Sequence, residues 1–185
     1  MNERAIRPVR RCRGFSLVEV MVALVVCAIG LLGLAKMGAL AVSSTSVASA
    51  RSLAAIQASS LAAAMHANHG YWAAGLAPAS TTVTVIGGTT TISDPGLASA
   101  ASCLVPGAGS CTASLMAAYD VQQWAAALQA LLPGSLGTIT CTTVTATPVT
   151  CTIQIQWTEG AVAANAQQTN INALQAPTYV LYVQP

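Results

Sequence analysis

One apolar run near the start of the chain limits its fold more than any other feature. Residues 15–35 carry a single charged side chain, Glu19, among apolar and small residues. As a helix, this segment would measure about 30 Å, the thickness of the hydrocarbon core of a membrane. Arginines precede the run and Lys36 follows it. Because such arginines stay on the cytoplasmic side, we predict a single-pass membrane helix over residues 15–35 whose carboxyl end faces outward.

Charge is distributed unevenly along the chain. The formal net charge is +2, yet five of the seven basic residues lie before Gly14: Arg4, Arg7, Arg10, Arg11 and Arg13. From residue 15 onward two basic side chains face four acidic ones, a net of −2: Lys36 and Arg51 against Glu19, Asp94, Asp120 and Glu159. Since that part has no basic patch, electrostatics do not favour a nucleic-acid partner.

Two ordinary explanations of the apolar run remain open at this point. A general secretory signal would be cut after the apolar stretch, and no convincing cut follows it here. A plain membrane anchor does not explain Glu19, because inserting an unpaired carboxylate into the hydrocarbon core of a membrane costs a few kcal/mol of free energy. A charge at such depth points by default to a functional role, although a position near the wet interface would also explain Glu19 tolerably well.

The segment around the start of the run carries a resemblance to a known family. It consists of a basic leader and then Gly14, Phe15, Ser16, Leu17, Val18 and Glu19, followed by about twenty apolar residues. This combination closely resembles the class III signal of type IV prepilins and pseudopilins. The resemblance implies that a membrane-embedded prepilin peptidase cleaves between Gly14 and Phe15 and methylates the new amino terminus at Phe15. It also implies that Glu19 pairs with the terminal amine of a neighbouring subunit during assembly.

Residues 28–35, AIGLLGLA, narrow the resemblance to the PilV-type minor pilins. A protein of this kind would help to initiate, prime or cap type IV pilus assembly, with indirect effects on twitching motility and cell adhesion. Its partners would be other major and minor pilins, the inner-membrane assembly platform and the prepilin peptidase. It would reside in the bacterial inner membrane with a periplasmic carboxyl terminus, and then in the pilus fibre at the cell surface. Two other readings stay open: a minor pseudopilin of type II secretion, and a pilus-tip adhesin or DNA-binding module.

The chain divides into three predicted parts: a leader over residues 1–14, a transmembrane and stalk helix over 15–67, and an α+β domain over 68–185. Residues 36–67 are rich in alanine and lack proline, which favours one long helix. Apolar and small residues recur at spacings of three and four, at Leu53, Ile56, Ser60 and Ala63, so that face is predicted to pack on a domain. The positions of Leu61 and Met65 leave two options, core or filament contact.

The remaining residues predict short strands and one helix. Residues 81–85 and 89–93 flank Gly87 and Gly88 as a hairpin. A helix is predicted over residues 115–132 with Ser114 as its cap, and strands over 149–157 and 178–183. Residues 94–114 are predicted as a loop, and residues 159–175 as a loop or an edge strand. The fold class is therefore α+β and pilin-like: a long amino-terminal helix whose Leu53 and Ile56 face is covered by an antiparallel sheet, with one extra helix. The strand order does not follow from the sequence.

Four cysteines in the polar part of the chain predict disulfide bonds in an oxidising compartment: Cys103, Cys111, Cys141 and Cys151. Cys103 and Cys111 are close enough in sequence to tie one loop. If the chain turns near Ala146, Ile139 and Cys141 lie opposite Ile153 and Cys151, which makes a Cys141–Cys151 bond reasonable. A zinc site is the alternative, but no CxxC motif or histidine pair brackets these residues.

The sequence contains no recognisable catalytic constellation. It lacks a glycine-rich phosphate loop, paired carboxylates and a nucleophile near a histidine. His66 and His69 could share a metal, but no third ligand is evident. Trp72, Trp124 and Trp157 are expected to anchor the core, and Asp120 to serve as a structural hydrogen-bond partner. We therefore predict no enzyme, no catalytic residues, no metal and no cofactor.

Overall fold

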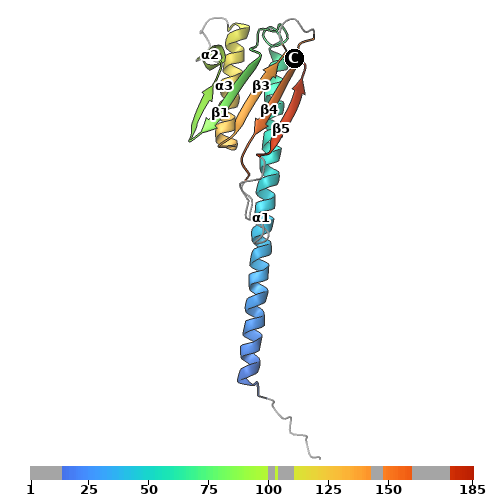
Figure 1. Ribbon diagram of the computed structural model, residues 1–185, viewed down its shortest axis with the longest axis vertical. Coiled ribbons are helices and arrows are strands. Elements are labelled where there is room, and N and C mark those ends of the chain that lie inside the picture. Colours follow the sequence, from blue (N-terminus) through green and yellow to red (C-terminus); the bar gives the residue numbers. More distant parts are fainter. Residues whose placement is uncertain (1–13, 100–102, 104–110, 143–147, 160–175) are drawn as a thin grey trace, which may run out of the picture. The chain divides into compact units, whose positions relative to one another are not determined.

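The computed structural model describes residues 14–99, 103, 111–142, 148–159 and 176–185 (Figure 1). The chain divides into two units, Met1–Val42 and Ser43–Pro185, and the boundary falls within the first helix. In its described part, the first unit consists of residues 14–16 and the beginning of that helix. The described residues of the second unit form the rest of the helix, a sheet and two further helices.

Helix α1 spans Leu17–Ala67. Its end agrees with the predicted end of the long helix, at the alanine before an Asn-His-Gly sequence. The backbone N–H of Asn68 still bonds to the carbonyl oxygen of Ala64, at 3.1 Å, after which the chain turns away. The prediction of one helix of about fifty residues is confirmed.

A five-stranded antiparallel sheet forms the centre of the second unit, in the order β2-β1-β3-β4-β5 (Figure 1). Its strands are β1 (Ser80–Ile86), β2 (Thr89–Ile92), β3 (Leu136–Cys141), β4 (Cys151–Gln156) and β5 (Thr178–Val183). Threonine and β-branched residues dominate these strands, and such residues suit a pleated, half-buried surface. The α+β, pilin-like fold class is therefore confirmed.

The predicted hairpin and the predicted strand register are both present. Gly87 and Gly88 have φ values of +58° and +77°, as the tight turn between β1 and β2 requires. In β3 and β4, Ile139 lies opposite Ile153 and Cys141 opposite Cys151. The turn expected near Ala146 lies outside the described residues, as do residues 160–175 of the predicted second loop.

Helix α3 spans Ala113–Leu131, close to the predicted 115–132, but its cap differs. The cap is Thr112, whose hydroxyl oxygen accepts a hydrogen bond from the Leu115 N–H at 3.3 Å. The prediction of Ser114 was wrong because the helix begins earlier and Ser114 lies in its first turn. A four-residue helix, α2 (Pro95–Ala98), also occurs where a loop was expected, with Asp94 capping the Leu97 N–H at 2.9 Å.

One buried core joins the inner face of the sheet, α3 and the part of α1 that lies in the second unit. On α1 the buried residues are Ala54, Gln57, Ala58, Leu61 and Met65. The predicted packing face was wrong: Ile56 is 54% exposed, and Leu53 is only partly buried. In an alanine-rich helix, several faces have apolar or small residues at spacings of three and four. The face that is buried carries Leu61 and Met65, whereas Ser60 and Ala63 lie on the predicted one.

Candidate functional site

The amino-terminal segment that carries the leader motif has a defined helix start. The carbonyl oxygen of Ser16 accepts hydrogen bonds from the N–H groups of Glu19, at 3.0 Å, and Val20, at 3.3 Å. Glu19 therefore lies in the first turn of α1, where the helix dipole favours a negative charge. No hydrogen bond or ion pair to its carboxylate occurs within the described part of the chain. The carboxylate is exposed and free to accept a partner.

Gly14 and Phe15, the two residues at the predicted cut, are both exposed. The Phe15 side chain is 81% exposed. A Cβ built at Gly14 would meet no other atom within 4 Å. The fold itself therefore places no steric demand for glycine at this position.

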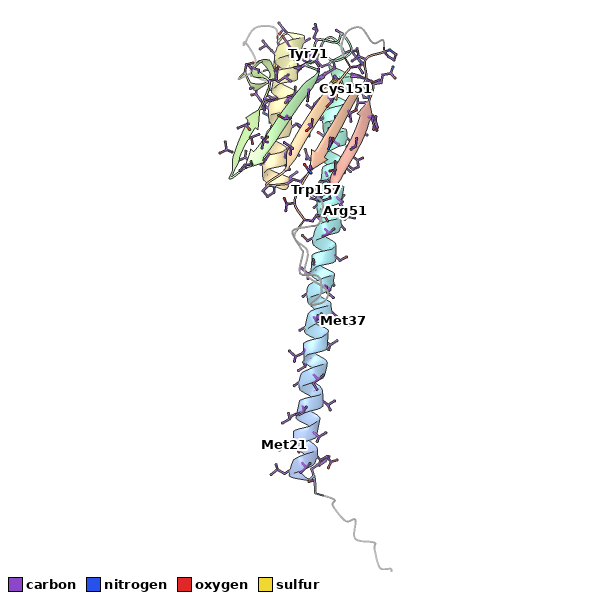
Figure 2. The ribbon with its side chains drawn as sticks, in the orientation of Figure 1. Met21, Met37, Arg51, Tyr71, Cys151 and Trp157 are labelled. Atoms are coloured by element: carbon purple, nitrogen blue, oxygen red, sulfur yellow. A yellow bond between two sulfur atoms is a disulfide. The ribbon has the colours of Figure 1, made fainter. Side chains whose placement is uncertain are left out.

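The first unit presents apolar side chains all around its helix. Every large apolar residue from Phe15 to Met37 that the structure describes is between 48% and 81% exposed. Met21 and Met37, labelled in Figure 2, both lie on this exposed surface. By length and composition, α1 is the one described helix that could cross a membrane. Such a surface fits membrane anchoring.

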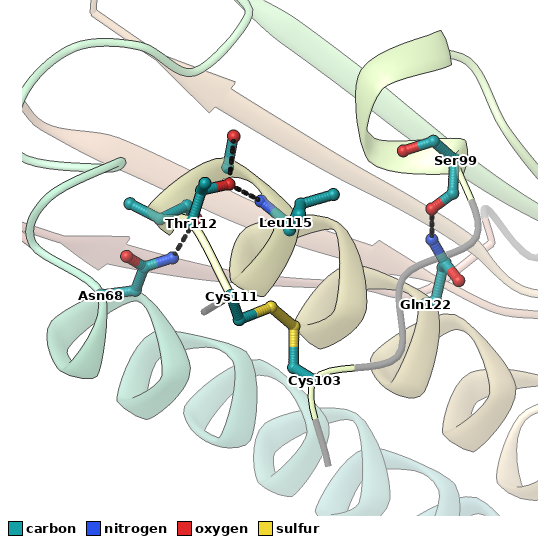
Figure 3. Close-up of a disulfide and its surroundings, with 9 residues drawn as sticks. Asn68, Ser99, Cys103, Cys111, Thr112, Leu115 and Gln122 are labelled. Carbon is teal, nitrogen blue, oxygen red and sulfur yellow. Dashed lines mark hydrogen bonds between the residues drawn. A yellow bond between two sulfur atoms is a disulfide. The ribbon is translucent and has the colours of Figure 1, made fainter. Parts of the chain in front are cut away.

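The four predicted cysteines form two disulfides in the structure. Cys141 and Cys151 join β3 to β4, with their Cα atoms 4.1 Å apart. Cys103 and Cys111 are joined just before α3, with a Cα–Cα distance of 5.7 Å (Figure 3). Beside the second bond, the side chain of Asn68 donates to the carbonyl oxygen of Ala113 at 2.8 Å, which ties the end of α1 to the start of α3. Among the described residues, Cys27 is a free thiol.

Residues 9–35 match the family model of the prokaryotic N-terminal methylation motif. The matched segment includes Gly14, Phe15, Glu19 and the apolar first part of α1. This motif supports a type IV pilin-like protein that is processed by prepilin peptidase and associates with pilins, a structural rather than an enzymatic role. Comparison with curated proteins gave no match, and neither did comparison with solved structures.

An ion pair in the second unit has no counterpart among the sequence predictions. Arg51 donates from Nε to Oε1 of Glu159 at 3.0 Å and from Nη2 to Oε2 at 3.3 Å. The two residues are 108 positions apart, so no local pattern could have indicated their contact. This fork of two bonds attaches the segment after β4 to α1.

The remaining polar candidates do not assemble into a catalytic site in the described residues. His66 and His69 have ring centroids 6.4 Å apart, and no described group of three metal-ligating side chains surrounds them. Trp72, Trp124 and Trp157 are 1–4% exposed, as expected of core anchors. Asp120 differs from its prediction: its carboxylate makes no hydrogen bond to any described residue, and burial raises its pKa.

Proposed function

We propose that this protein is a minor pilin that helps to initiate, prime or cap the assembly of a type IV pilus. In this proposal the precursor is cut between Gly14 and Phe15, and the new amino terminus at Phe15 is methylated. The match of residues 9–35 to the N-terminal methylation motif is the observation that carries the proposal. The exposed apolar surface of the first unit supports it, because that surface suits first a bilayer and then a bundle of pilin helices.

Glu19 has a specific role in this proposal. A carboxylate in an apolar bundle is destabilised unless a positive group pairs with it. The amine of Phe15 on a neighbouring subunit supplies that group once cleavage has created it. The free, first-turn carboxylate of Glu19 is consistent with such pairing.

The test of this function uses Glu19→Ala in the full chain, expressed in a host that makes type IV pili. We expect normal cleavage, seen by mass spectrometry as a chain that begins at methylated Phe15, and at least a tenfold loss from sheared surface fibres. A tenfold loss corresponds to about 1.4 kcal/mol, a modest value for an ion pair in an apolar bundle.

Val18→Ala is the matched control, because it shortens the neighbouring exposed side chain without changing charge. It should leave both cleavage and incorporation near wild type. Normal incorporation of Glu19→Ala would contradict the proposed pairing, and a mature chain that does not begin at Phe15 would contradict the assignment as a whole. Recovery of the chain from a periplasmic pseudopilus, but not from surface fibres, would instead indicate a type II secretion pseudopilin.

A further inference from the structure

A groove between α1 and α3 contains a carboxylate that has no partner among the described residues. The groove lies within the second unit and has a volume of about 190 Å³. Asp120 lines it from α3, and burial raises the pKa of this carboxyl group. Gln57, Ser60 and Ala64 line it from α1.

The other acidic side chains of the second unit all have assigned partners. Asp94 accepts from the Leu97 N–H at the start of α2, and Glu159 holds Arg51 through two bonds. In residues 43–185, Arg51 is the only lysine or arginine in the sequence, so no further basic side chain of this unit remains for Asp120. A carboxylate that is partly withdrawn from water and left unpaired is unfavourable, and a positive group relieves that cost.

A second polar group in the groove also lacks a partner. Gln57 is 7% exposed, and its side-chain amide makes no hydrogen bond within the described residues. Its backbone carbonyl is already engaged, because the Trp124 indole N–H donates to it at 3.1 Å. The amide atoms of Gln57 are not among the fully buried unpaired atoms of the described residues, so they are open to the groove and available to a ligand with polar hydrogens.

We infer that this groove receives a lysine or arginine side chain from an adjacent pilin-type subunit, with Asp120 as the counter-ion and Gln57 as a hydrogen-bond acceptor. The apolar lining residues Leu61, Ala64, Trp124 and Ala127 suit the methylene stem of such a side chain, and the polar groups of Asp120 and Gln57 suit its charged head. The site rests on the proposed function, since that function brings other pilin subunits alongside α1.

The experiment compares substitutions of Asp120 in the full chain, by the fraction of chain recovered in sheared fibres. Asp120→Glu should stay near wild type, Asp120→Asn should fall about fivefold, and Asp120→Lys should fall more than tenfold because it adds repulsion. Ala130→Lys adds the same charge at an exposed position of α3 outside the groove and should incorporate normally. Equal losses in Asp120→Asn and Asp120→Lys, or wild-type incorporation of Asp120→Lys, would overturn the inference.

Two further measurements separate assembly from folding. Because the folded state raises the pKa of Asp120, the charged form opposes folding at neutral pH, so purified Asp120→Asn should unfold at a temperature no lower than wild type. Gln57→Leu removes the side-chain amide but keeps the backbone carbonyl that accepts from Trp124, so it should also remain folded while incorporation falls twofold to threefold. Wild-type incorporation of folded Gln57→Leu would contradict its role as an acceptor.

These experiments distinguish a failure of the groove inference from a failure of the proposed function. If the wild-type chain is processed at Phe15 and enters fibres but the Asp120 series has no effect, the groove inference is wrong and the function stands. If the purified full chain binds free spermidine saturably while Asp120→Lys still assembles normally, the site takes a small cation and the subunit contact is wrong. If the wild-type chain never enters fibres, the function itself is wrong.

Discussion

At the scale of single residues, the contact between Gly137 and Trp124 sets the spacing between the sheet and α3. A Cβ at Gly137, in the middle strand β3, would lie 2.5 Å from the Cη2 atom of the Trp124 ring. The ring has little freedom to withdraw, because it is 4% exposed and its N–H bonds to the carbonyl oxygen of Gln57. The absence of a side chain at Gly137 therefore lets α3 pack closely on the sheet.

Gly137→Ala is expected to lower the free energy of unfolding by about 1–3 kcal/mol, the usual cost of overpacking a core. Thermal or denaturant unfolding of the purified full chain measures this change. Gly70→Ala is the matched control, because its new Cβ would lie at an ordinary 3.4 Å from the Ala113 Cβ atom, and we expect a change within about 0.5 kcal/mol. Equal stabilities of the two variants would show that α3 can shift to accommodate the methyl group.

Residue contacts across long sequence distances were the least predictable part of the molecule. The Arg51–Glu159 pair joins residues 108 positions apart, and the unpartnered amide of Gln57 depends on how α3 packs against α1. The position of Asp120 beside an apolar helix face predicts a structural hydrogen bond for its carboxylate. The structure shows no hydrogen bond between that carboxylate and any described residue. Such outcomes depend on three-dimensional packing, whereas sequence patterns report only local periodicity and local partners.

At the scale of elements, predictions succeeded where local chemistry dictates geometry. The Gly87-Gly88 pair fixes a tight turn, and strict alternation in residues 149–157 fixes which face of β4 is buried, as its observed burial pattern shows. The phase of the second half of α1 could not be obtained in this way. Alanine and serine occupy most positions of this half, so two adjacent faces of the helix look equally apolar in the sequence. Which face is buried depends on how the helix packs in the core with the sheet.

The corrected packing face of α1 predicts opposite behaviour for two large apolar residues of the same helix. Leu61 is 1% exposed in the core, whereas Ile56 is 54% exposed. Leu61→Ala should lower the free energy of unfolding by about 2–5 kcal/mol, because it opens a cavity in the core. Ile56→Ala should change it by less than about 1 kcal/mol, which makes it an internal control in the same unfolding assay. If Ile56→Ala lowered the free energy of unfolding more than Leu61→Ala, the packing face predicted from the sequence would be the correct one.

At the scale of the whole molecule, processing would reverse the sign of the charge. The intact chain has a formal charge of +2, and residues 15–185 alone carry two basic and four acidic side chains, a net of −2. The basic character thus belongs to the leader, which in the proposed function orients the precursor in the membrane and is then removed. The sequence alone could predict this organisation because the leader's pattern is local and contiguous, and the match of residues 9–35 to the N-terminal methylation motif agrees with it.

Gly14→Leu tests whether this charge reversal depends on recognition of the cut and not on folding. A Cβ at Gly14 would meet no other atom within 4 Å, so we expect the fold to be unaffected. In the proposed function, the peptidase must still accept the peptide bond before Phe15. We expect the variant to remain uncleaved, to retain the basic isoelectric point of the precursor and to be absent from surface fibres. Gly30→Ala, which also enters open space, should be processed normally. Isoelectric focusing and intact mass together measure the result. A Gly14→Leu chain of mature mass and acidic isoelectric point would show that cleavage before Phe15 does not need glycine, and a cleaved chain of another mass would place the cut elsewhere.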